Sequence, residues 1–191
     1  MIKKIYYKYA LPILRDLYTQ GFTHPFTWYV KDTLGNDLVG VEIGVFKGEN
    51  AKNMLNVLSI KKLYLVDPYE LYNDDSCSSY QMDKNSNNIE LQAKKRLRNN
   101  SNIEFLKKKS IDAVDDIPND LDFVYIDGDH SYEGTKIDII YYWPKVKIGG
   151  IIGGDDFTLG HVGLIRAVIE FVNNNNLKLE GTKENWWVIK R

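Results

Sequence analysis

The chain has 191 residues, of which 43% are hydrophobic and 27% charged, and its formal net charge is −1. This composition is typical of one soluble globular domain and excludes disordered and fibrous proteins. The near-zero charge argues against a nucleic-acid partner, and no apolar run approaches the roughly 20 residues that span a bilayer, so no membrane partner is expected. The single cysteine, Cys77, allows no intrachain disulfide and fits a reducing, cytoplasmic location.

The hydrophobic pattern predicts an N-terminal helix to about residue 21, an irregular stretch over 21–37, and then alternating strands and helices. The expected strands cover residues 38–45, 62–67, 103–108, 121–127, 148–154, 177–181 and 185–191. The expected helices between them cover residues 48–58, 89–100, 110–117, 135–144 and 163–173.

This alternation predicts an α/β fold of the Rossmann-like, doubly wound type. Right-handed crossovers would give a mainly parallel, seven-stranded sheet with helices on both faces. No helix separates the last two strands, so the last strand is expected to run antiparallel, at or near an edge. We therefore expect a single domain over residues 1–191, with an N-terminal helix and loop over residues 1–37.

One long polar segment, "YELYNDDSCSSYQMDKNSNN", covers residues 69–88. A loop of this length in a compact domain is usually a lid or is disordered. Because it leaves a strand at the expected ligand-binding edge, we interpret it as a substrate lid. Tyr69, Tyr72 and Tyr80 would supply its amphipathic contacts.

The ends of the first two strands predict a nucleotide-type ligand. Parallel sheets bind ligands beyond the carboxyl ends of their strands, where the strand order reverses. In "VEIGVFKGEN", Gly44 and Gly48 allow a sharp turn and a close approach of the backbone before the next helix. Asp67 ends the second strand about 20 residues later, where an acid commonly binds ribose hydroxyls. These features alone fit adenosylmethionine and NAD equally, and a turn or helix cap would also use such residues.

Three acids follow the fourth and fifth strands. Asp127 ends "DFVYID", and Asp155 and Asp156 follow "IIGG". Neighbouring parallel strands lie about 4.8 Å apart, so these carboxylates could converge and would then repel one another. A hard divalent cation such as Mg²⁺ would remove that repulsion. The alternative is that one acid caps a helix while the others face water.

Asp129 and His130 lie next to these acids in the sequence. A histidine titrates near neutral pH, so His130 could act as the general base for an acceptor hydroxyl. A helix-capping role for His130 is the alternative. His24 and His161 have no acidic neighbours in the sequence, and we interpret them as loop residues.

The segments "VEIGVFKGENA", "LYLVDPYE", "DFVYIDGDHSYEG" and "GGDDF", followed by "GLIRAVIEF", resemble the class I S-adenosylmethionine-dependent methyltransferases. The resemblance is strongest to a small group, methyltransferase family 24-like, whose fourth strand ends in Asp-Gly-x-His-Ser-Tyr. The macrocin-type sugar O-methyltransferases are similar, and the catechol-type O-methyltransferases more distantly so. The likeness runs from about Val39 to the C-terminus.

The resemblance implies a role for each matching residue. Glu42, Gly44 and Gly48 match the loop around the methionine part of S-adenosylmethionine, Asp67 the ribose-binding acid, and Ser110 the turn beside adenine. Asp127, Asp155 and Asp156 match the acids that hold Mg²⁺, or another divalent cation, in metal-dependent members. Asp129 matches the base of the macrocin-type enzymes, and His130 lies where the catechol-type enzymes have a catalytic lysine; the sequence does not choose between these two.

One departure from the family concerns the fifth strand. Gly153 and Gly154 stand where bulkier apolar residues are usual, which would either loosen the packing beside the cation site or leave room for a ligand.

The predicted function is therefore an S-adenosylmethionine-dependent, Mg²⁺-assisted O-methyltransferase. Its acceptor would be a small hydroxylated molecule, plausibly a sugar or glycan precursor. The alternatives are a nicotinamide-dependent oxidoreductase, which the missing third glycine disfavours, and a non-catalytic methyltransferase-like binding domain. The likeness also extends to proteins described as hydroxylases. The apolar and aromatic termini are compatible with a homodimer.

Overall fold

The computed structural model describes residues 23–70 and 86–191. The expected N-terminal helix and most of the expected lid, including Tyr72, Cys77 and Tyr80, lie outside these residues. Within the two described ranges, no helix combines the length and apolar character needed to cross a membrane.

Strands and helices alternate along the described chain, as predicted. The strands are β1 (Leu38–Ile43), β2 (Ile60–Val66), β3 (Ile103–Leu106), β4 (Leu121–Ile126), β5 (Val146–Gly154), β6 (Glu180–Thr182) and β7 (Asn185–Ile189). The helices are α3 (Pro25–Thr33), α4 (Glu49–Val57), α6 (Ser86–Leu97), α7 (Ser110–Ala113), α8 (Tyr132–Tyr142) and α9 (Val162–Asn174), with short 3-10 helices η2 (Val114–Asp116) and η3 (Trp143–Lys145).

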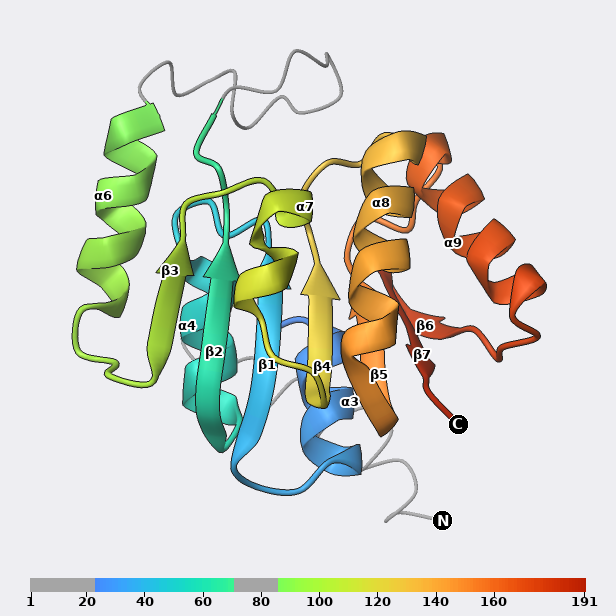
Figure 1. The fold of residues 1–191 in the computed structure, drawn as a ribbon, viewed down its shortest axis with the longest axis horizontal. Coiled ribbons are helices and arrows are strands. Elements are labelled where there is room, and N and C mark those ends of the chain that lie inside the picture. Colours follow the sequence, from blue (N-terminus) through green and yellow to red (C-terminus); the bar gives the residue numbers. More distant parts are fainter. Residues whose placement is uncertain (1–22, 71–85) are drawn as a thin grey trace, which may run out of the picture.

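The strands form one seven-stranded sheet in the order β3-β2-β1-β4-β5-β7-β6 (Figure 1). Strands β1 to β5 run parallel, whereas β7 pairs antiparallel with both β5 and β6. The predicted fold class and the antiparallel last strand are thus confirmed. The strand order reverses between β1 and β4, which makes the carboxyl ends of these two strands the expected ligand site.

Helices cover both faces of the sheet (Figure 1). On one face, side chains from α3, α4 and α6, including Phe26 and Met54, pack against Phe123 of β4. On the other face, side chains from α7, α8 and α9, including Tyr142, pack with Val124. Every residue of β4 is buried, which explains why this strand is an almost uninterrupted apolar run that ends abruptly in polar residues.

The stretch expected to be irregular, residues 21–37, contains the nine-residue helix α3, so that expectation was wrong. Pro25 stands in the first turn, where its missing N–H group is not needed. The backbone N–H of Phe26 donates to Asn185 Oδ1 over 3.0 Å, so the helix begins against β7. A helix this short is stabilised mainly by tertiary packing, which the sequence pattern does not reveal.

The glycines at the end of β5 neither loosen the packing nor leave room for a ligand, so both alternatives considered for them were wrong. A Cβ atom at Gly153 would lie 2.2 Å from the carbonyl oxygen of Trp186, and one at Gly154 would lie 2.1 Å from that of Ile126. The neighbouring strands therefore fill the space that side chains would need. Trp186 itself is buried in the core at 1% exposure.

Candidate active site

The loop after β1 passes close to the end of β4. Gly44 has a φ of +85°, and a Cβ atom there would lie 2.0 Å from the carbonyl oxygen of Asp127. Gly48, with a φ of +72°, is the N-cap of α4. Both positions require the backbone freedom of glycine. The predicted glycine loop therefore turns sharply beside the reversal of strand order.

Glu42, near the end of β1, is 1% exposed. Asn50 Nδ2 donates to its Oε1 over 2.9 Å, whereas Oε2 has no hydrogen-bond partner among the described residues. Burial raises the pKa of Glu42 well above its ordinary value, although the hydrogen bond from Asn50 opposes this shift. A buried carboxylate oxygen without a partner is costly, so Glu42 is ready to accept a hydrogen bond from a ligand.

Asp67, at the end of β2, supports the glycine loop. Its Oδ2 accepts hydrogen bonds from the backbone N–H groups of Val45 and Phe46 over 2.9 Å and 2.8 Å. Its Oδ1 accepts from the N–H of Tyr69 over 2.7 Å. Asp67 therefore holds the glycine loop in place through these hydrogen bonds. Ribose binding by Asp67 stays a prediction.

A cavity of about 340 Å³ opens beyond the ends of β1 and β2. Its lining includes Gly44 and Ser110 of the predicted cofactor residues, together with Glu70, Asp129 and Asp138. A mostly apolar pocket of this size with a few polar groups is typical of a small-molecule site. The sequence analysis did not predict that Glu70 and Asp138 line this cavity. The sequence gives only one indication for Glu70, its position three residues after Asp67, and none for Asp138.

Asp138 lies on α8 and is 3% exposed. Burial raises its pKa to about 7, despite the opposing hydrogen bond with the Ser110 side chain. The hydroxyl group of Tyr142, one turn later, donates to the backbone oxygen of Ser110 over 2.9 Å. Side chains of α8 thus fix the start of α7, where the resemblance places adenine.

The three acids predicted to bind a cation do end neighbouring strands, but Asp155 is already engaged. Asn185 Nδ2 donates to Asp155 Oδ1 over 2.6 Å, and His24 Nδ1 lies 2.9 Å from Asp155 Oδ2. Burial would raise the pKa of Asp155, but its contacts with His24 and Asn185 hold it below the ordinary value. Asp127 has a raised pKa because of burial and the nearby acids, with His130 opposing the shift.

Two groups of at least three potential metal ligands occur among the described residues. Their ligand atoms all lie within 4.8 Å of one another, and the groups are His130, Asp156 and His161, and Asp155, Asp156 and Glu184. Asp156 belongs to both groups and Asp127 to neither. The three predicted acids therefore fit a cation only in part.

His24 and His161 lie in loops, as predicted, but each has an acidic partner in space that the prediction missed. His24 contacts Asp155, and His161 Nε2 lies 3.9 Å from Asp156 Oδ1. Burial would lower the pKa of His24, but Asp155 and the acids near it raise it above its ordinary value. His24 is distant in sequence from Asp155, whereas His161 follows Asp156 on the same loop after β5, and the fold sets both contacts.

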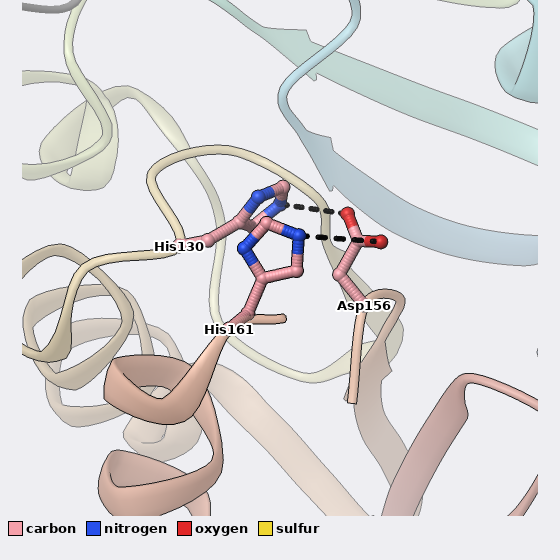
Figure 2. Close-up of side chains that lie close together, drawn as sticks. All are labelled: His130, Asp156 and His161. Atoms are coloured by element: carbon pink, nitrogen blue, oxygen red, sulfur yellow. Dashed lines mark ion pairs between the residues drawn. The ribbon is translucent and has the colours of Figure 1, made fainter. Parts of the chain in front are cut away.

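The structure separates the two candidate bases. His130 Nε2 points toward Asp156 Oδ2, 3.2 Å away (Figure 2). The same nitrogen lies 3.5 Å from Asp127 Oδ1. Asp129 instead lines the cavity beside Gly134, and its Oδ1 accepts from the N–H of Ser131 over 2.8 Å. Ser131 is in turn the N-cap of α8, so this capping role falls to neither candidate base.

The cavity, the glycine loop and the neighbouring acids lie together at the carboxyl ends of β1, β2, β4 and β5, where the strand order reverses. The family model described as "Methyltransferase domain" matches residues 41–157, which is more than half of the chain. The chain therefore belongs to this methyltransferase family.

One relative is a viral protein without a described activity. An uncharacterized protein of Acanthamoeba polyphaga mimivirus is 31% identical over 147 residues, which cover 72% of this chain and 62% of the viral protein. This chain thus matches less than two thirds of that relative's length.

Solved structures share the fold at low identity. The O-methyltransferase NovP superposes with a TM-score of 0.64 and 18% identity, covering 86% of this chain and 79% of NovP. SMU.1697c of Streptococcus mutans, in complex with SAH, gives a TM-score of 0.65 and 11% identity, covering 87% of this chain and 96% of that protein. At these identities the likeness concerns the fold alone.

Proposed function

We propose that this methyltransferase transfers the methyl group of S-adenosylmethionine to a hydroxyl oxygen of a small acceptor, with a sugar or glycan precursor as the expected class. The observation that carries the proposal is the juxtaposition of the cavity beside Gly44 with the carboxylates and His130 at the ends of β4 and β5. The cavity would hold the methyl donor, and the groups at the strand ends would hold the acceptor and take its proton.

The cofactor would occupy the cavity. Glu42 Oε2 is suited to accept a hydrogen bond from the ammonium group of the methionine part, because it is buried without a partner among the described residues. Gly44 and Gly48 let the backbone approach the ligand, and Asp67 holds their loop in place and is the proposed ribose-binding acid. Ser110 would contact the adenine.

In the reaction, the acceptor oxygen attacks the methyl carbon, the carbon–sulfur bond breaks, and S-adenosylhomocysteine leaves. We propose Asp129 as the group that takes the hydroxyl proton, because its carboxylate lines the donor cavity. A divalent cation, Mg²⁺ or another, held near Asp156 at the ends of β4 and β5 would lower the pKa of the acceptor hydroxyl. Most of the rate enhancement would come from orientation of the two reactants.

Calorimetric titration of the full chain with S-adenosylhomocysteine, first with Mg²⁺ and then with EDTA, tests the donor. Micromolar binding is expected, and Gly44→Ala should weaken it. NADH is titrated in parallel: binding of NADH alone would replace the proposal by a nicotinamide oxidoreductase, and binding of neither would favour a non-catalytic domain.

Mass spectrometry of mixtures of labelled S-adenosylmethionine with hydroxylated compounds then identifies the acceptor. With that acceptor, Asp129→Asn should lower kcat about 100-fold or more while the affinity for S-adenosylhomocysteine is kept. Asp112→Asn, on the exposed side of α7, is the matched control. Unchanged turnover in Asp129→Asn would exclude Asp129 as the base.

A further inference from the structure

We propose that His130, Asp156 and His161 form a binding site for a divalent transition-metal ion of the Zn²⁺, Fe²⁺ or Co²⁺ type, in place of a Mg²⁺ site made of three carboxylates. This deepens the proposed function, since it names the cation that would assist the acceptor. The binding of metal can be measured without any methyl transfer.

The geometry of the three side chains suits one ion (Figure 2). His130 Nε2 lies 3.2 Å from Asp156 Oδ2, and His161 Nε2 lies 3.9 Å from Asp156 Oδ1. Ligand atoms about 2.0–2.1 Å from a tetrahedral ion are separated by roughly 3.4 Å from one another. The three ligand atoms lie within 4.8 Å of one another, so a contraction of at most about 1.4 Å would bring them all within bonding distance of one ion.

A buried nitrogen points into this group. The His130 side chain is 10% exposed, and its Nε2 makes no hydrogen bond of good geometry within the described part of the chain. The His161 ring lies beside it, with 4.6 Å between the ring centroids. Two imidazoles and a carboxylate in contact, with a buried nitrogen lacking a hydrogen bond, are what a metal site presents before its ion binds.

The fold brings the two histidines together at a specific contact. A Cβ atom at Gly163, in the first turn of α9, would lie 2.6 Å from the backbone nitrogen of Tyr132 and 3.3 Å from the carbonyl oxygen of His130. Glycine at this position allows the start of α9 to pack directly on the loop after β4. His161, the N-cap residue of α9, is thereby placed beside His130.

The ligand types determine the class of ion. Imidazole nitrogen suits Zn²⁺, Fe²⁺, Co²⁺ and Ni²⁺, whereas Mg²⁺ prefers oxygen in octahedral geometry. The carboxylates do not supply an equivalent oxygen site, because both oxygens of Asp155 already have partners and Glu184 is exposed. Three protein ligands would leave coordination positions open for an acceptor oxygen.

The test uses the purified full chain after removal of metal with a chelator. Titration with Co²⁺ is followed by visible absorption, and Zn²⁺ and Mg²⁺ are compared by calorimetry. We expect one Co²⁺ or Zn²⁺ per chain, bound at least about 100-fold more tightly than Mg²⁺. Equal affinity for Mg²⁺, or no binding of Co²⁺ and Zn²⁺, would overturn the proposal.

Variants locate the site. His161→Ala should lower the affinity for Zn²⁺ by more than about tenfold, the loss expected even for residues that only orient a ligand. His24→Gln is the matched control, because the ion pair of His24 is with Asp155, which is not one of the three proposed ligands. If His24→Gln weakened Zn²⁺ binding and His161→Ala did not, the ion would bind at Asp155 and the proposal would fail.

A measurement on the unmodified chain covers the case in which a variant does not fold. The chain contains three histidines, so peptide mapping can follow each one after reaction with diethylpyrocarbonate. Zn²⁺ should protect His130 and His161 but not His24; equal protection of all three, or of none, would contradict the site. Binding of S-adenosylhomocysteine, measured on the same sample, reports separately on the proposed methyl donor.

Discussion

The backbone of Gly44 packs directly on the carbonyl group of Asp127, so the ends of β1 and β4 touch where the strand order reverses. Gly44→Ala would place a methyl group 2.0 Å from that oxygen at a φ of +85°. We expect a loss of unfolding free energy of at least about 2 kcal/mol and weaker binding of S-adenosylhomocysteine. Urea unfolding and calorimetry measure the two effects.

Gly149→Ala is the matched control for Gly44→Ala. Gly149 has a similar φ of +82°, but a Cβ atom there would meet nothing within 4 Å. Gly149→Ala should lower the free energy of unfolding only by the backbone strain, about 1 kcal/mol, and leave ligand binding unchanged. Equal effects of the two substitutions would show that the contact with Asp127 is unimportant.

Glu42→Gln should separate stability from binding. The substitution removes a buried carboxylate whose pKa burial raises, and an amide can still bond to Asn50, so stability should hold or rise. Affinity for S-adenosylhomocysteine should fall about tenfold or more, because the ammonium group loses its charged partner. Glu49→Gln, whose side chain is 70% exposed, serves as the control in both assays. Unchanged affinity in Glu42→Gln would place the ammonium group elsewhere.

Asp138 predicts a pH dependence of stability. Its pKa is about 7 in the folded protein and about 3.9 in an unfolded chain, so between these values the folded state binds more protons. Stability contributed by this group is therefore fully present below about pH 4 and is lost as the pH rises through about 7.

Asp138→Asn should remove that slope. Urea unfolding from pH 4.5 to 8 should show a flatter profile than the native chain, and a variant that is more stable at pH 8. Asp112→Asn should keep the native profile. Parallel profiles for Asp138→Asn and the native chain would mean that Asp138 does not carry the raised pKa.

Gly153→Ala tests the tight packing of β5 against β7. The added methyl group would lie 2.2 Å from the carbonyl oxygen of Trp186 and 2.7 Å from Trp187 Cβ. Overpacking of this kind typically costs about 1–3 kcal/mol, and backbone contacts place this case at the upper end. Gly160→Ala, with its nearest neighbour at 3.4 Å, should be close to neutral in the same denaturant titration. If Gly153→Ala unfolded at the same urea concentration as Gly160→Ala, β5 and β7 could move apart to admit the methyl group, and the packing between them would not be tight.

Local sequence was enough to predict the alternating elements, the sheet and the edge of the sheet at which the glycine loop and the acids lie. Gly44, Asp67 and Asp127 each follow an apolar strand directly, and parallel strands bring their ends to one edge. The topology alone therefore places these residues near one another. The helix α3 was missed because its few apolar positions gain their stability from β7, which lies at the other end of the chain.

The acceptor side depends on contacts that no local pattern specifies. His24 and Asn185 reach Asp155 from opposite ends of the chain, and His161 reaches Asp156 through the packing of Gly163 on the loop after β4. The contact between Asp155 and Asn185 continues the register of β5 and β7 by one position, whereas the two histidines lie outside the strands. Gly153 was misread for the same reason, since only the position of β7 shows what fills the space beside it.

The region shared with the methyltransferase family, residues 41–157, contains Asp155 and Asp156 but excludes His24, His161 and Asn185. The common part of the chain therefore carries the proposed donor site, while the segments on either side of it supply residues that surround the acids. Under the proposed function, donor use and acceptor choice would have separate origins in the sequence. We expect that exchange of these flanking segments between relatives would change which molecule is methylated and leave the source of the methyl group the same.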